Sequence, residues 1–161
     1  MRPQATAQSW KIKPMPSQQK ELLIDGAYAA PEMGQIALGY IPQEQQDKWF
    51  IYFDGQWLHF HRSWTGSCIF QMRLLREEGH YRADKLLVNQ DPAQYKMDDD
   101  QYNLSLAAYL VDHLLLRRFA QMPLPGNMSE QDQQRHQQHV MGQKGGNGRS
   151  IPLNLLPGNE K

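Results

Sequence analysis

Two histidines separated by one residue form the first pattern in this chain that could do chemistry. His59 and His61 flank Phe60 in a stretch rich in β-forming residues. Because alternate side chains of a strand point to the same face, both imidazoles can reach one metal ion. A third ligand would have to come from distant donors, of which the sequence offers His80, His113, Glu77 and Glu78. We therefore expect two solvent-edge histidines on an aromatic face, and we predict no metal and no cofactor.

A polar connection follows, with the sequence Arg62-Ser63-Trp64-Thr65-Gly66-Ser67. An arginine can form a fork with a phosphate or carboxylate, an indole can stack on a planar ring, and a glycine lets the backbone approach closely. Together with His59 and His61, this loop is the predicted ligand-binding site. The alternative is a tight turn in which Ser63 and Thr65 bond their own backbone and Trp64 plugs the end of the sheet.

The single cysteine, Cys68, invites comparison with catalytic thiols. A nearby histidine could serve as its base if the thiol pKa were lowered. Its neighbours at alternate strand positions, Phe70 and Met72, are apolar, and this favours a buried structural thiol. The nucleophile elbow, the P-loop, the HExxH motif and the CxxC motif are all missing from the sequence. We predict no catalytic residues and lean against an enzyme.

The elements that must position these residues begin with a β-hairpin. The β-rich runs 49–53 and 57–61 flank Asp54-Gly55, a dipeptide that suits a two-residue turn. Such a turn pairs Tyr52 with Trp57. One face then carries predicted core residues, Trp49, Ile51, Phe53, Leu58 and Phe60. The other face carries amphipathic residues, Phe50, Tyr52, Trp57, His59 and His61.

The remaining elements complete a predicted α+β fold. Strands over 68–73, or a little beyond, and over 81–88 continue the hairpin as an antiparallel meander. Residues 17–26 predict a two-turn helix, and residues 36–41 predict a strand. An acidic N-cap precedes a long helix over Tyr102–Phe119. We expect a β-meander of about 4–5 strands packed against this C-terminal helix, with disordered N- and C-terminal extensions.

The long helix has apolar side chains on two stripes rather than one. The first stripe suits a sheet face and contains Leu104, Ala107, Ala108, Leu110, Val111, Leu114, Leu115 and Phe119. The opposite stripe stands where a surface helix normally carries charges, and contains Tyr102, Leu106, Tyr109, His113 and Leu116. We interpret this second stripe, with Phe50, Tyr52 and Trp57 of the sheet, as a protein interface.

Composition sets the organisation and excludes some partners. We divide the chain into an N-terminal arm (1–16) that docks by Trp10, one domain (17–122), and a flexible Gln- and Gly-rich tail (123–161) with an apolar patch at 151–157. The 17 Lys and Arg residues balance 17 Asp and Glu residues, so we do not expect nucleic acid as a partner. The chain lacks an apolar run that could span a membrane and an N-terminal secretory signal, so we expect a cytoplasmic location.

Two functional hypotheses follow. The first is a small cytoplasmic protein-interaction or accessory module, which docks a partner or self-associates through the amphipathic sheet face or the second helix stripe. The second is the binding or processing of a phosphate-bearing or nucleotide-like small molecule at the Arg62–Ser67 loop.

Overall fold

The computed structural model describes residues 3–119, 121–124 and 139–140. The chain divides into two compact units. The first unit comprises residues 1–42 and 49–123, and it holds all the elements named below. The second comprises residues 43–48 and 124–161. In its described part, the Asp47 carboxylate accepts the backbone N–H groups of Gln43 and Glu44, which closes a short turn.

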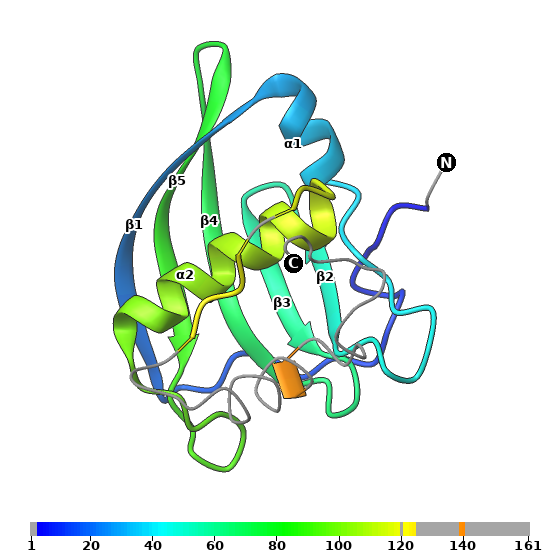
Figure 1. Ribbon diagram of the computed structural model, residues 1–161, viewed down its shortest axis with the longest axis vertical. Helices are drawn as coiled ribbons and strands as arrows, with labels where there is room; N and C mark the ends of the chain where they lie inside the picture. Colours follow the sequence, from blue (N-terminus) through cyan, green and yellow to red (C-terminus); the bar gives the residue numbers. More distant parts are fainter. Residues whose placement is uncertain (1–2, 120, 125–138, 141–161) are drawn as a thin grey trace. The chain divides into compact units, whose positions relative to one another are not determined.

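Five antiparallel strands form one sheet in the first unit (Figure 1). In chain order they are β1 (Gln19–Ala29), β2 (Trp49–Phe53), β3 (Trp57–Arg62), β4 (Cys68–Glu77) and β5 (His80–Asn89). Their order in the sheet is β1-β5-β4-β3-β2. Strands β2 to β5 follow one another as the predicted meander, and β1 joins it beside β5. The predicted α+β class, with a sheet and a packed helix, is confirmed.

The helices are α1 (Ala30–Ile36) and α2 (Asp100–Leu110), and α2 continues into a π-helical turn, η1 (Val111–Leu115). The carboxylate of Asp99 caps α2 by accepting the N–H of Tyr102 at 3.1 Å. Helix α2 crosses one face of the sheet (Figure 1). None of the helices in the described part of the chain is long and apolar enough to cross a membrane.

The sheet face beneath α2 is the core. Phe60 and Phe70 meet edge to face there, with ring centroids 5.9 Å apart, and Tyr95 meets Phe70 in the same way. Of the five residues predicted for the core face of the hairpin, Trp49, Ile51, Leu58 and Phe60 are buried and Phe53 is half-buried. Period-two alternation therefore identified the correct inward face.

The predicted pairing of the hairpin is wrong by two residues along β3, because the turn lies one residue later in the chain than predicted. Phe53 pairs with Leu58, and Tyr52 pairs with His59 rather than with Trp57. The two loop residues are Gly55 and Gln56, because the N–H of Asp54 already bonds to the carbonyl of Trp57. Gly55 has a φ of 107°, which suits the first loop position of a type II′ turn. Because the pairing shifts by an even number of residues, each side chain stays on the face of the hairpin predicted for it.

The predicted helix over 17–26 is wrong, because most of this segment is strand β1. Its Leu22 pairs with Leu86 of β5 and is buried. A two-turn helix is marginal in water, whereas the strand gains a ladder of hydrogen bonds and a buried leucine. The register with β5 shifts between Leu23 and Gly26, so the predicted helix stop lies at an irregularity in a strand.

The predicted strand over 36–41 is also wrong. Helix α1 begins at Ala30 and has Pro31 in its first turn, and the Glu32 carboxylate accepts the N–H of Ala29 at 2.8 Å. These are helix-start signals that outweigh the β-forming residues downstream. Of the predicted strand, Tyr40 makes one isolated bridge, to Ile51.

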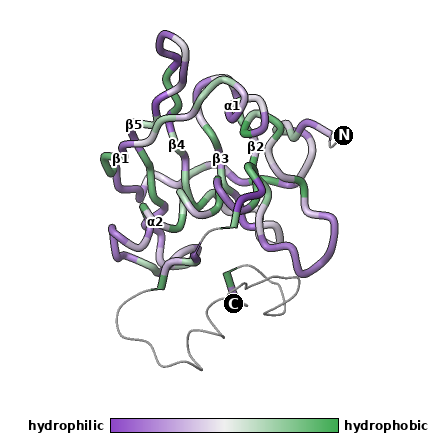
Figure 2. The backbone as a smooth tube through the Cα atoms, turned by 45° about the horizontal axis from the view of Figure 1, so that its top comes forward, coloured by the Kyte–Doolittle hydropathy of each residue, from purple (hydrophilic) through white to green (hydrophobic). Residues whose placement is uncertain are grey.

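Strands β4 and β5 are both longer than predicted at the ends that meet their connecting turn. The turn contains Glu78 and Gly79, and Gly79 has a φ of 79°. Figure 2 shows the tip of this hairpin as hydrophilic. At the tip His80 pairs with Glu77 at 3.2 Å, so two of the distant metal-ligand candidates contact each other there.

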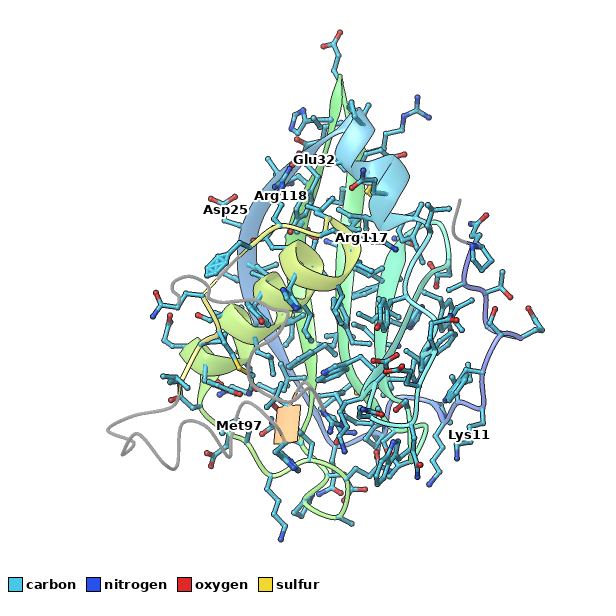
Figure 3. All side chains as sticks on the ribbon, turned by 45° about the vertical axis from the view of Figure 1, so that its right-hand side comes forward. Lys11, Asp25, Glu32, Met97, Arg117 and Arg118 are labelled. Carbon is cyan, nitrogen blue, oxygen red and sulfur yellow. The ribbon has the colours of Figure 1, made fainter. Side chains whose placement is uncertain are left out.

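The C-terminal helix is shorter than the predicted Tyr102–Phe119 segment. The helical segment ends at Leu115, and Arg117 has a φ of 57°. Arg118 turns back to form ion pairs with Glu32 of α1 and with Asp112 (Figure 3). The predicted core residue Phe119 therefore lies beyond the helix, and 69% of its surface is exposed.

The N-terminal arm runs past the edge of β2 and below the strands to the start of β1 (Figure 1). Its Ala5 is buried and donates its N–H to the carbonyl of Leu38 at 2.7 Å. The indole of Trp10 stacks on Phe50 and donates to the carbonyl of Ser63 at 2.8 Å, so Trp10 docks as expected. The predicted tail (123–161) lies almost entirely outside the described residues, and its apolar patch at 151–157 lies wholly outside them.

Candidate functional site

Strands β3 and β4 bring His59, His61 and Cys68 together. One ring nitrogen of each histidine and the Cys68 Sγ all lie within 4.8 Å of one another. A β-bulge produces this arrangement. Phe60 pairs with Phe70, but the register then shifts and His61 pairs with Cys68. Without the shift, Ile69 would stand opposite His61, and the thiol would lie on the other face.

His61 has a defined tautomer and an unsatisfied nitrogen. Its Nδ1 lies 2.8 Å from the carbonyl of Gly66 and must donate, because a carbonyl oxygen only accepts. Its Nε2 is buried and has no hydrogen-bond partner in the structure. Burial lowers the pKa of His61, with the Gly66 hydrogen bond opposing this effect and the His59 ring adding to it. The neutral imidazole therefore directs an unused lone pair into the interior.

His59 has a carboxylate behind it. Its Nε2 donates to the Asp54 Oδ2 at 2.8 Å, and its Nδ1 accepts from the Gln71 side-chain amide at 3.0 Å. Desolvation works to raise the pKa of Asp54, but hydrogen bonds from the amides of Trp57 and Gln56 and from His59 outweigh it, so that pKa is lowered. Asp54 is thus an ionised group that fixes the orientation of the His59 ring.

Cys68 is fully buried, as the sequence predicted for a structural thiol. Burial raises the pKa of its thiol to about 12. The Sγ lies 3.5 Å from the carbonyl oxygen of Phe70, its weak acceptor. A thiol in this environment is protonated and a poor nucleophile near neutral pH, so the geometry does not favour covalent catalysis at Cys68.

Aromatic rings enclose the cluster. Tyr52 stacks on His59 with centroids 4.6 Å apart and on His61 with centroids 5.8 Å apart. Phe50 lies against His61 and Tyr52, beneath the indole of Trp10. Of the residues predicted to form a sheet interface, Phe50 is fully buried, whereas Tyr52 and Trp57 are half-buried. The face predicted as an exposed docking surface is therefore largely internal at its centre.

The Arg62–Ser67 loop is a tight turn. The N–H of Gly66 bonds to the carbonyl of Arg62, and the N–H of Ser67 bonds to the Thr65 hydroxyl oxygen. Gly66 has a φ of 80°, and an added Cβ would lie 3.0 Å from the carbonyl oxygen of Lys11. Ser63 is buried, whereas 55% of Trp64 is exposed, so Trp64 does not plug the sheet. The loop matches the turn alternative in part.

Arg62 and His61 point to opposite faces of β3. The guanidinium of Arg62 lies over the Trp49 ring, 4.8 Å from its centroid, on the core side. Burial lowers the pKa of Arg62, against opposing contributions from Tyr95 and Tyr102. The structure therefore does not combine Arg62 and the histidines into one ligand site.

The second helix stripe is buried rather than displayed. Tyr102, Leu106, Tyr109 and Leu116 each expose 9% or less of their surface. His113 is half-buried and stacks on Tyr109 with centroids 5.1 Å apart. Burial lowers the pKa of His113 and raises the pKa of Tyr109 to about 12. The four buried side chains are therefore not an exposed surface in this structure.

No protein family, curated protein or solved structure matches this chain. A function for this chain is therefore inferred from the chemistry of the site.

Three members of the site escaped the sequence analysis. Cys68 was weighed as a nucleophile but not as a third metal ligand, and Asp54 and Gln71 were not considered beside His59. The pattern His-x-His followed seven residues later by Cys was visible. The bulge that turns Cys68 toward His61 had no sequence signal, because Ile69 and Cys68 suit a strand equally well.

Proposed function

We propose that this chain binds one transition-metal ion through His59, His61 and Cys68. The observation that carries the proposal is the buried Nε2 of His61, which has no hydrogen-bond partner. Leaving a buried acceptor unpaired costs about 1–3 kcal/mol. A metal ion bonded to that nitrogen would offset this cost, and donor atoms of His59 and Cys68, which cluster with a His61 ring nitrogen within 4.8 Å, would complete its coordination.

The hydrogen bonds behind the cluster support the same function. Histidines that bind metal ions normally donate their other ring N–H to a carbonyl or carboxylate, which fixes the tautomer and the ring orientation. His61 donates to the Gly66 carbonyl, and His59 donates to the Asp54 carboxylate. Each ring therefore keeps a lone pair on its other nitrogen. For His59 that nitrogen is Nδ1, so the Gln71 amide must move aside when a metal binds.

The donor types select the kind of metal. Imidazole nitrogen and thiolate sulfur suit zinc, copper and similar ions, whereas calcium and magnesium prefer oxygen. The Cys68 thiol would lose its proton on binding, as metal-bound thiols do. Metal–ligand bonds of about 2.0–2.3 Å require a small closing movement of the three side chains from their present separation.

The proposal is tested by adding cobalt(II), a coloured substitute for zinc, to the full-length chain. We expect one equivalent to bind, with the strong near-ultraviolet absorption of a cobalt–thiolate bond. His59→Gln and Cys68→Ala should each lose this absorption. Because the sequence also holds His136 and His139, both are replaced by Asn in every protein tested.

The matched control is His80→Asn, at the exposed hairpin turn. It should bind cobalt as well as the parent protein does. Saturating zinc should also stabilise the parent, by about 2.7 kcal/mol at a hundred times the dissociation constant. The proposal is rejected if zinc and cobalt leave the melting temperature and the spectrum unchanged, or if His80→Asn abolishes binding as completely as His59→Gln.

A further inference from the structure

The cluster offers three donors, and this number distinguishes among metals. In the described part of the chain, the group comprises two imidazoles and one thiol. Structural zinc sites almost always have four protein ligands in a tetrahedron. Zinc sites with three protein ligands keep a fourth position open for water or substrate. A three-donor site suits zinc only where water can reach the metal.

The surroundings of the cluster limit access of water. Cys68 is fully buried, and 2% of the His61 surface is exposed. Phe50 and Tyr52 stack around the imidazoles, and Trp10 of the arm lies against Phe50. The least enclosed member is His59, whose side chain is 12% exposed beside Asp54. A metal can enter on the His59 side, but the site has little room for a permanent water ligand.

A dry site with two histidines and one cysteine matches the preference of copper. Trigonal coordination by two histidines and one cysteine is typical of protein copper centres, often with a weak fourth contact from methionine, glutamine or a backbone oxygen. Thiolate sulfur is also a soft ligand that favours copper(I). Gln71, whose amide nitrogen lies 3.0 Å from the His59 Nδ1, can supply such a weak contact once its side chain turns away from that nitrogen and presents its oxygen to the metal.

We infer that the ion bound by His59, His61 and Cys68 is copper, held in a trigonal site with two nitrogen ligands and one sulfur ligand. The inference rests on the proposed function. On binding copper(I), the Cys68 S–H bond breaks, a copper–sulfur bond forms, and the proton leaves to solvent. The oxidised form differs by one electron, which the metal gives to an added oxidant and regains from a reductant such as ascorbate.

The first experiment compares metals on the same protein. Full-length chain with His136 and His139 replaced by Asn is titrated with copper(I) under anaerobic conditions and separately with zinc, each against a competing chelator of known affinity. We expect one equivalent of each metal to bind and copper(I) to bind at least a hundredfold more tightly. Cys68→Ser should reduce copper(I) affinity by at least a hundredfold and zinc affinity by a smaller factor. His80→Asn should change neither.

The second experiment reports the geometry of copper itself. Oxidising the copper(I) protein should produce an intense visible absorption from thiolate-to-copper charge transfer, and ascorbate should bleach it reversibly. A pale absorption typical of tetragonal nitrogen and oxygen ligands would overturn the trigonal assignment. Tighter binding of zinc than of copper(I) would overturn the copper inference and leave the proposed function standing. Failure of both metals to bind would reject both, and the parent titration decides this even if Cys68→Ser does not fold.

Discussion

The outer face of the sheet, opposite α2, has two halves that follow the same strand alternation yet have different environments. On β2, β3 and the start of β4 the outward residues are rings and a thiol, including Phe50, His61 and Cys68, and all three are buried. On β4, β5 and β1 they form ion pairs, among them Arg73–Asp84 and Arg82–Glu77. The first half lies beneath the N-terminal arm, and the second faces solvent. The alternation of side chains along a strand therefore shows which residues share a face of the sheet. Whether that face is exposed to solvent depends on whether another segment of the chain packs against it.

The largest effect should come from removing the ring at the centre of the covered half. Phe50→Ala should lower the free energy of unfolding by about 3–5 kcal/mol, because Phe50 is fully buried between Trp10 and the sheet. Urea denaturation measures this change. Leu23→Ala, in the other half and 79% exposed, is the control and should stay within about 0.5 kcal/mol. Equal effects of the two variants would contradict the division into two halves.

The close approach of Gly39 to β2 and to Ala5 of the arm gives the next largest effect. A Cβ at Gly39 would lie 2.2 Å from the Ile51 carbonyl oxygen and 2.9 Å from the Ala5 Cβ, and Gly39 has a φ of 68°. Gly39→Ala should cost roughly 3 kcal/mol from backbone strain and displacement of the arm. At Gly34 of α1 a Cβ meets no atom within 4 Å, so Gly34→Ala should be neutral or stabilising. Thermal denaturation of the two variants makes the comparison.

Docking of the arm itself should contribute a smaller amount. Trp10→Ala removes the stacking on Phe50 and the hydrogen bond to Ser63, and should cost roughly 2 kcal/mol because the indole is only half-buried. It should also speed trypsin cleavage after Lys11, since Lys13 precedes a proline and is not a trypsin site. Trp64→Ala, at a residue 55% exposed, serves as the control for loss of an indole. Unchanged cleavage in Trp10→Ala would show that other contacts hold the arm.

The ion-pair half should show the smallest effect and a distinct pH dependence. The Arg73 hydrogen bond holds the pKa of Asp84 below its ordinary value. Its stabilising contribution is therefore present above the unfolded-state pKa of about 3.9 and is lost as the pH falls through the folded-state value. At neutral pH, Asp84→Asn should cost at most about 1 kcal/mol, since the pair is solvent-screened. The stability curves of parent and variant should converge in acid.

Much of the fold was predictable wherever local signals agreed with the tertiary structure. The hairpin, the two following strands and the start of α2 combined β-forming residues, turn residues and an acidic cap, and each appeared with the predicted type. The predicted types of residues 17–26 and 36–41 were wrong: the first segment is mostly strand, and the second follows a helix that ends at Ile36. In the first, pairing of Leu22 with Leu86 outweighed weak helix propensity. In the second, Pro31 and Glu32 began a helix that the β-forming residues beyond it obscured.

The candidate site was predictable only in part, because strand spacing is visible in the sequence but the positions of bulges and turns are not. The His-x-His spacing put both imidazoles on one face of β3, as period-two geometry requires. The third donor depended on a bulge in β4, and the outer carboxylate depended on a turn shifted by one residue, which placed Asp54 beside His59. Single-residue shifts of this kind leave composition and alternation almost unchanged.

The sequence by itself determined which residues share a face, because strand and helix periods are properties of the local backbone. It also determined that His59 and His61 share one face and that an acidic residue caps the C-terminal helix. Tertiary structure alone decided which faces are covered, since covering requires contacts between segments far apart in the chain. The arm covers part of an amphipathic sheet face by stacking Trp10 on Phe50, and the side chains of the predicted interface stripe are mostly buried. Both outcomes depend on burial of apolar side chains by distant segments of the chain, and a local sequence pattern does not contain this contribution to the free energy.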